Sequence, residues 1–218
     1  MNWKIADSNH FLYCLTSDEV SLSHSEQVQF MCLSGVKLIQ LRSKVLPRDQ
    51  LFDEATKSVE ISKSFGATLI VNDCIEVAKH SGASGVHLGI KDVCPVRACD
   101  FLEDDQLIGE TVHSLREAKE VKERGVCSYV GLGPYRKSFT KKALKPQLST
   151  DEFSEIIKTL QPIPVYLIGG LVLEDFDLLD PLGLAGICVC SGLSEGEQFG
   201  VHLPAFVKGA EKLKFAEV

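Results

Sequence analysis

Short apolar runs recur along the chain, roughly every 20 to 30 residues, and each ends in polar or charged residues. Most are continuous rather than alternating, which is typical of parallel strands that are covered on both faces. The predicted strands are Phe11–Thr16, Val36–Arg42, Thr68–Asn72, Gly85–Leu88, Leu107–Thr111, Tyr129–Leu132, Val165–Ile168 and Gly186–Cys190.

Segments between these runs have the spacing of amphipathic helices. Pro47–Ser64 and Asp151–Leu160 each place their apolar residues near one face, and Ser114–Glu123 opens with a serine cap followed three residues later by Glu117. Strand–helix alternation repeated eight times predicts an α/β fold, a single TIM barrel of the (β/α)8 type over residues 1–218. Its active site is expected at the C-terminal ends of the strands.

A doubly wound open sheet is the alternative fold. Such a sheet should carry a glycine-rich turn after its first strand, but Thr16-Ser17-Asp18-Glu19 stands there instead. The barrel is therefore favoured.

Composition narrows the classes of function. A net charge of -7 argues against general nucleic-acid binding, which calls for a basic surface. The 218 residues contain neither a leader peptide nor an apolar run near 18 residues, so we expect a soluble cytoplasmic protein without membrane contact. Eight scattered cysteines without a CxxC pair favour buried thiols over a disulfide framework or a zinc site. A homo-oligomer remains open.

The second predicted strand ends in Ile39-Gln40-Leu41-Arg42-Ser43-Lys44. Side chains alternate along a strand, so Gln40, Arg42 and Lys44 project to one face. Two cations and an amide gathered there indicate a site for phosphate or diphosphate. A solvated strand end with incidental charges is the alternative.

Two carboxylates follow neighbouring strands. Asp73 and Asp92, together with a diphosphate, would suit Mg²⁺, which takes oxygen ligands and usually shares substrate phosphates. The alternative is that each aspartate caps the helix that follows it.

Glycines follow the last two strands, in Ile168-Gly169-Gly170 and Cys190-Ser191-Gly192. Loops at these positions often form a phosphate site in (β/α)8 barrels. The alternative is that these glycines only allow the chain to turn. With the diphosphate site, this predicts two phosphorylated small-molecule substrates or one large one.

The histidines give little indication of acid–base catalysis. His87 lies in an apolar strand and is expected to be an interior residue, whereas His113 could reach the mouth. The sequence suggests neither a nucleophilic triad nor a general base. The long segment 133–150, rich in lysine, is a candidate lid.

Together these segments resemble the thiamine phosphate synthase family along nearly the whole chain. The resemblance rests on seven pieces in order along the chain: Ile39–Lys44, Val71–Asp73, Gly85–Gly89 with Asp92, Gly131–Pro134, Ser138–Lys141, Ile168–Gly170 and Cys190-Ser191. It implies a transferase that condenses 4-amino-2-methylpyrimidine-5-ylmethyl diphosphate with a thiazole phosphate, giving thiamine phosphate and diphosphate by a dissociative, carbocation-like substitution.

The family pattern also implies residue roles. Arg42, Lys44 and Lys141 would stabilise the leaving diphosphate, and Asp73 and Asp92 would hold Mg²⁺. The substrate-binding set would be Gln40, Leu41, Arg42, Ser43, Lys44, Asn72, Thr111, Ser138, Phe139, Thr140, Lys141, Gly170, Cys190 and Ser191.

The chain departs from that pattern at Ile90, Thr111, Ser138 and Cys190. Thr111 and Ser138 keep a hydroxyl, whereas Ile90 removes a polar group near Asp92. Two alternatives stay open. One is a paralogue like the sister thiazole tautomerases, using His113; the other is a non-catalytic barrel that binds a thiamine precursor.

Overall fold

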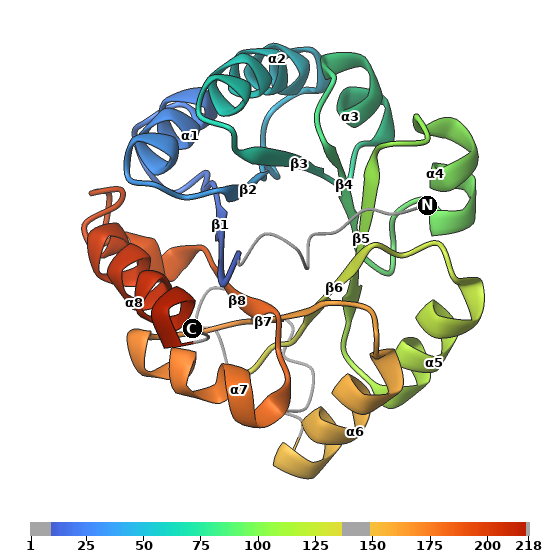
Figure 1. Cartoon of the computed structure of the whole chain (residues 1–218). Helices are drawn as coiled ribbons and strands as arrows, with labels where there is room; N and C mark the ends of the chain where they lie inside the picture. The colour runs from blue at the N-terminus through green and yellow to red at the C-terminus, as the bar shows by residue number, and fades with distance from the viewer. Residues whose placement is uncertain (1–9, 137–148, 217–218) are drawn as a thin grey trace.

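The eight predicted strands form one closed barrel. A computed structural model describes residues 10–136 and 149–216, and within it the strands pair in parallel in chain order, with β8 returning to β1 (Figure 1). This confirms the (β/α)8 barrel over the doubly wound sheet. The strands are β1 (Leu12–Leu15), β2 (Leu38–Leu41), β3 (Thr68–Asn72), β4 (Gly85–Leu88), β5 (Leu107–Val112), β6 (Tyr129–Leu132), β7 (Val165–Ile168) and β8 (Gly186–Val189).

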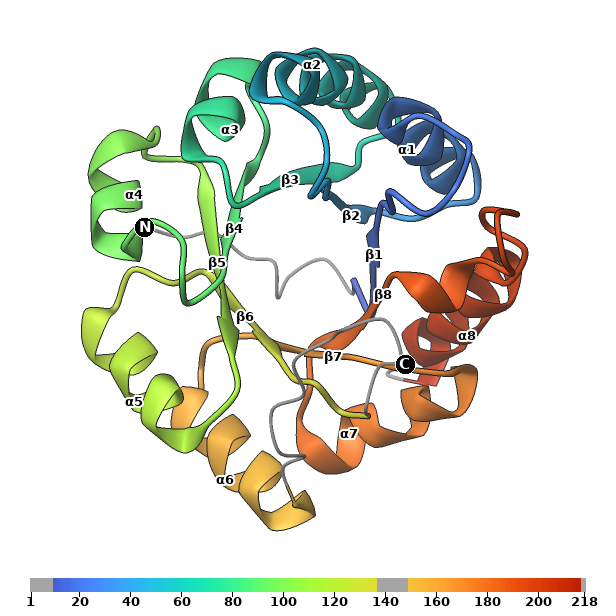
Figure 2. The ribbon, with the colours of Figure 1, turned by 180° about the vertical axis from the view of Figure 1, so that it is seen from behind.

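Helices ring the strands, and α8 lies beside α1 to complete the ring in both views (Figures 1 and 2). The helices are α1 (His24–Leu33), α2 (Arg48–Ser64), α3 (Ile75–Ser81), α4 (Pro95–Phe101), α5 (Leu115–Arg124), α6 (Thr150–Leu160), α7 (Leu179–Leu182) and α8 (Leu203–Ala216). Two short 3₁₀ turns follow β7 and β8: η2 (Leu173–Leu178) and η3 (Ser191–Leu193).

Local signals set the helix ends. The Ser114 side chain accepts a hydrogen bond from the Glu117 N–H, as the predicted cap requires, and Gly125 ends α5 in the left-handed conformation. The helices expected at Pro47–Ser64 and Asp151–Leu160 are α2 and α6, shifted by one residue at the start. The described residues include no helix with the length and apolar character to cross a bilayer.

Strand alternation divides the core into two layers. Residues such as Ile39, Leu41 and Val86 pack between the barrel wall and the helices. The barrel interior holds a smaller cluster, in which Tyr13 and Tyr129 are almost fully buried. Because the interior side chains lead directly to the C-terminal strand ends, this inner layer supports the mouth of the barrel.

Candidate active site

A cavity of about 490 Å³ opens at the C-terminal ends of β1, β2, β7 and β8. It is by position the mouth expected of a (β/α)8 barrel. Among its lining residues are five that the sequence pointed to, from strand ends on either side of β1: Arg42, Lys44, Gly170, Cys190 and Ser191.

The end of β2 delivers its charged residues to this cavity. Gln40 is 2% exposed and points into the barrel, whereas the Leu41 side chain packs against the helix layer, so only its main chain is available to a ligand. The Lys44 ammonium pairs with the Asp73 carboxylate at the end of the neighbouring strand β3. Arg42 and Lys44 thus line the same cavity, although the Lys44 side chain is still half exposed.

The two predicted metal carboxylates lie against each other. Burial raises the pKa of Asp92, and the neighbouring Asp73 raises it further through a side-chain hydrogen bond and charge repulsion. Asp73 holds a left-handed backbone with φ of 65°, a conformation that aspartate tolerates better than most residues. Two adjacent carboxylates concentrate negative charge, which Lys44 offsets in part and a bound cation would relieve further.

Helix capping does not explain these carboxylates. The residues at the N-terminal caps of α3 and α4 are Cys74 and Cys94, and neither helix has a side-chain cap. Asp92 instead accepts a hydrogen bond from the Gly89 N–H at 2.6 Å. The capping alternative is therefore wrong for both aspartates.

Within 10–136 and 149–216, three or more His, Cys, Asp or Glu residues do not gather into a group that could hold a metal ion. Asp73 and Asp92 supply carboxylate oxygens, the donors that Mg²⁺ takes. A bound Mg²⁺ would then need its remaining ligands from water or substrate phosphate, as is usual for this ion. The donor set thus fits a shared magnesium site and not an all-protein cage.

A chain of hydrogen bonds crosses the barrel interior beneath the mouth. The Gln40 Nε2 donates to the Tyr13 hydroxyl at 2.7 Å, and that hydroxyl lies 2.9 Å from the Tyr129 hydroxyl. Tyr129 is 3.1 Å from His87 Nδ1, and His87 Nε2 is 2.8 Å from the Thr111 hydroxyl. We call these five side chains the interior relay. It joins two residues of the predicted substrate set, Gln40 and Thr111, and so fixes both.

Burial lowers the pKa of His87 to about 4, so the ring is neutral at pH 7, as expected of an interior histidine. Gly109 makes room for the relay, because a Cβ there would stand 2.2 Å from Tyr129 Cζ and 2.6 Å from His87 Nδ1. Tyr13 and Tyr129 were not singled out from the sequence, since both lie in apolar strands and look like core. The signal that could have found them is strand alternation, which places both tyrosines on the same inward-facing side of the barrel wall as Gln40.

The β7–β8 side of the mouth is built from backbone. Gly170 has φ of 62°, and Arg136 Nη1 donates to its carbonyl at 3.1 Å. The Arg136 guanidinium also makes two hydrogen bonds to the buried Asp175 carboxylate, at 2.5 and 2.7 Å. The glycine turn after β7 is therefore held by an ion pair that stands outside the cavity lining.

Several predicted residues lie elsewhere. Asp92 and Thr111 border a separate cavity of about 310 Å³ beside α5, and the buried Asn72 Nδ2 has no hydrogen-bond partner among the described residues. His113 contacts the Gly133 carbonyl and is not among the residues that line either cavity. Ser138, Phe139, Thr140, Lys141 and most of the candidate lid at 133–150 fall outside the described residues.

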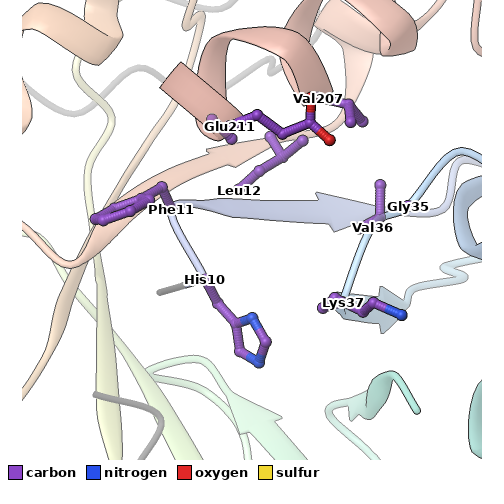
Figure 3. Close-up of a pocket in the computed structure, with 9 residues that line it drawn as sticks. His10, Phe11, Leu12, Gly35, Val36, Lys37, Val207 and Glu211 are labelled. Carbon is purple, nitrogen blue, oxygen red and sulfur yellow. The ribbon is translucent and has the colours of Figure 1, made fainter. Parts of the chain in front are cut away.

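Another hollow lies at the opposite end of the barrel (Figure 3). Its walls come from the starts of β1 and β2 and from α8, and its volume is about 50 Å³. That is room for a few water molecules. Lys37, which lines it, donates its ammonium to the Phe65 carbonyl at 2.6 Å. This hollow is therefore far smaller than the cavity of about 490 Å³ at the C-terminal strand ends.

Fold and site together define the class: a (β/α)8-barrel enzyme whose mouth gathers cations, paired carboxylates and a glycine turn. A protein-family model described as thiamine monophosphate synthase matches residues 12–193. The chain belongs to this family, and its members are transferases.

Relatives agree with that assignment. The thiamine-phosphate synthase of Dictyoglomus turgidum is 33% identical over 180 residues, covering 82% of this chain and 79% of the relative. That of Caldicellulosiruptor saccharolyticus is 35% identical over 180 residues, covering 82% and 80%. The solved thiamine phosphate pyrophosphorylase from Pyrococcus furiosus superposes with a TM-score of 0.81 at 24% identity, covering 95% of this chain and 98% of that chain, and so supports the fold.

Proposed function

We propose that this protein condenses 4-amino-2-methylpyrimidin-5-ylmethyl diphosphate with a thiazole phosphate to give thiamine phosphate and diphosphate. The observation that carries the proposal is the placement of Arg42 and Lys44 in the same cavity as the Gly170 and Ser191 turns. One wall suits the leaving diphosphate, and the facing wall suits a second phosphate.

The chemistry proceeds in two stages. The bond between the methylene carbon and the diphosphate oxygen breaks, and the diphosphate leaves with the electron pair. The aminopyrimidine ring donates electron density to the resulting methylene cation, which the thiazole nitrogen then captures. No proton has to be removed, which agrees with a mouth rich in charge-binding groups.

Each part of the mouth has a role in this proposal. Arg42 and Lys44 would neutralise charge that develops on the diphosphate, and Asp73 and Asp92 would hold Mg²⁺, which supplies further neutralisation when bound. Gln40 and Thr111, fixed by the interior relay, would orient the pyrimidine. Gly170, Cys190 and Ser191 would receive the thiazole phosphate. Lys141, Ser138, Phe139 and Thr140 complete the set by resemblance alone.

The test incubates purified protein with both substrates and Mg²⁺ and assays thiamine phosphate and diphosphate. Equimolar formation of both, lost with EDTA and restored by added Mg²⁺, is the expected result. Folded protein that binds both substrates without turnover would contradict the proposal. Isomerisation of the thiazole phosphate alone, abolished by His113→Ala, would assign a tautomerase instead.

A further inference from the structure

The loop from Thr16 to Ser23, between β1 and α1, is bonded to the end of β2. Thr16 is fully buried, and its hydroxyl accepts a hydrogen bond from the Arg42 N–H at 2.9 Å. The Asp18 carboxylate accepts from the Ser43 hydroxyl at 2.5 Å and from the Lys44 N–H at 2.8 Å. Two side chains of this loop therefore hold three consecutive residues of the charged segment 42–44.

Asp18 is itself held in place by His24, the first residue of α1. His24 Nε2 lies 3.1 Å from the Asp18 carboxylate and Nδ1 lies 2.7 Å from the Thr16 hydroxyl, in a ring that is 6% exposed. The arrangement is not a nucleophilic triad, since the Thr16 hydroxyl is sealed from solvent and bonded to the main chain. It joins the two side chains into one unit.

Asp18 is charged at neutral pH. Burial raises the pKa of its carboxyl, but the hydrogen bonds from Ser43, Lys44 and His24 outweigh burial and bring the pKa below its ordinary value. Asp18 also lines the cavity with Arg42 and Lys44. A negative charge at that place repels an incoming diphosphate, so by charge alone it opposes binding.

The hydrogen bonds that Asp18 accepts can favour binding of the anion even though its charge does not. The Ser43 hydroxyl donates its hydrogen bond to Asp18, so this hydrogen is not available to a phosphate oxygen. The Lys44 N–H is likewise occupied. The Asp18 carboxylate thus uses its acceptors to fix the main chain that carries the two cations, and cations held in place lose less freedom when an anion binds.

We propose that Asp18, held by His24, is a positioning residue that sets the Arg42 and Lys44 side chains toward the diphosphate. It touches no reacting atom. The inference rests on the proposed function for the identity of the anion, a diphosphate, and goes beyond it in assigning a role to the β1–α1 loop.

The two possible roles of Asp18 predict opposite changes in the affinity for diphosphate when its charge is removed. Asp18→Asn keeps the size of the side chain but leaves one acceptor oxygen for three donors. If Asp18 acts through its charge alone, removing that charge tightens anion binding. If it positions segment 42–44, the variant binds more weakly, by about tenfold. Glu19→Gln is the matched control, because Glu19 is an exposed carboxylate on the same loop and the change removes the same charge.

The measurement is the Kd of inorganic diphosphate with Mg²⁺ by calorimetry, which needs no turnover. We expect about tenfold weaker binding for Asp18→Asn and an unchanged or slightly tighter Kd for Glu19→Gln. Binding by Asp18→Asn that is as tight as, or tighter than, that of the wild type overturns the inference. In turnover, KM for the pyrimidine diphosphate should rise while KM for the thiazole phosphate stays constant.

Three further outcomes are decisive. If circular dichroism shows that Asp18→Asn does not fold, His24→Phe takes its place, because this change keeps an aromatic ring and loses both hydrogen bonds. Weaker diphosphate binding by His24→Phe supports the inference, and unchanged binding refutes it. If the wild type binds diphosphate but makes no thiamine phosphate, the proposed function fails while the Asp18 comparison still gives its answer. Wild-type protein that does not bind diphosphate overturns both.

Discussion

The two sides of the barrel mouth are built differently. On the β2–β5 side, the chemistry lies in side chains: Arg42 and Lys44 face the cavity, and Asp73 and Asp92 lie against each other. On the β7–β8 side, it lies in backbone, where a left-handed glycine turn is held from behind by Arg136.

This difference teaches how each side recognises an anion. Mobile charged side chains bind strongly but must be held. On the β2–β5 side the Asp18 loop holds the main chain of segment 42–44, and the interior relay fixes the uncharged Gln40 and Thr111. A backbone turn carries partial charges only and is already fixed by the chain. The first arrangement suits an anion whose charge grows during the reaction, and the second suits a phosphate that only anchors its substrate.

Replacing the cation should have the largest effect. Arg42→Ala removes charge stabilisation of the leaving group, so kcat/KM should fall by about 10² to 10³ while the free energy of unfolding changes by less than about 1 kcal/mol. Steady-state kinetics and urea denaturation measure the two. Arg97→Ala, an exposed cation on α4, is the control. Parallel losses of activity and stability would show that Arg42 is structural.

Asp92→Asn should weaken the use of Mg²⁺, raising its half-saturating concentration about tenfold, since one oxygen ligand loses its charge. The pKa of Asp92 is raised, so in the wild type metal use should begin to fail, as pH decreases, at a higher pH than an ordinary aspartate would cause. Metal titrations at several pH values test both statements. Asp100→Asn, exposed on α4, is the control; an equal response of the two variants would exclude Asp92 as a ligand.

Gly170→Ala probes the backbone side. Its new Cβ would lie 3.0 Å from Arg136 Cβ at a φ of 62°, so the turn must shift, and KM for the thiazole phosphate should rise about fivefold with little change for the pyrimidine diphosphate. Gly125→Ala carries the same backbone penalty at φ of 65° but meets nothing within 4 Å. A rise in both KM values for Gly170→Ala would mean that the two sides are not separable.

Tyr129→Phe should give the smallest effect, a two- to threefold rise in KM for the pyrimidine diphosphate, by cutting the interior relay at one hydroxyl. The estimate is about 1 kcal/mol for a neutral hydrogen bond, shared between stability and binding. Tyr166→Phe is matched, because Tyr166 stacks edge-on against both Tyr13 and Tyr129 without being a link in the relay. Equal KM changes in the two variants would leave the relay without a role in binding.

Much of the fold was readable from the sequence, because parallel strands buried on both faces leave continuous apolar runs. Glycine and charge at the strand ends placed Arg42, Lys44 and Gly170 at one cavity. Alternation also put Gln40 inside the barrel and Leu41 outside it.

The contacts that hold the site residues in place could not be predicted from the sequence. Asp18 and Ser43 are 25 positions apart, and nothing in the spacing of two polar loop residues shows that they bond. The same holds for the relay, whose Tyr13 and Tyr129 hydroxyls meet across 116 positions. Such contacts depend on the register of strands in three dimensions, which local sequence propensity does not determine.

Gly109 has a consequence for anyone redesigning or diversifying this protein. The space beside it belongs to Tyr129 and His87, so even a methyl group there would collide with both. A mutational survey should therefore find position 109 intolerant although it holds no chemical group. Libraries aimed at new substrates will do better to vary the rim of the cavity and leave Gly109 and the interior relay beneath it untouched.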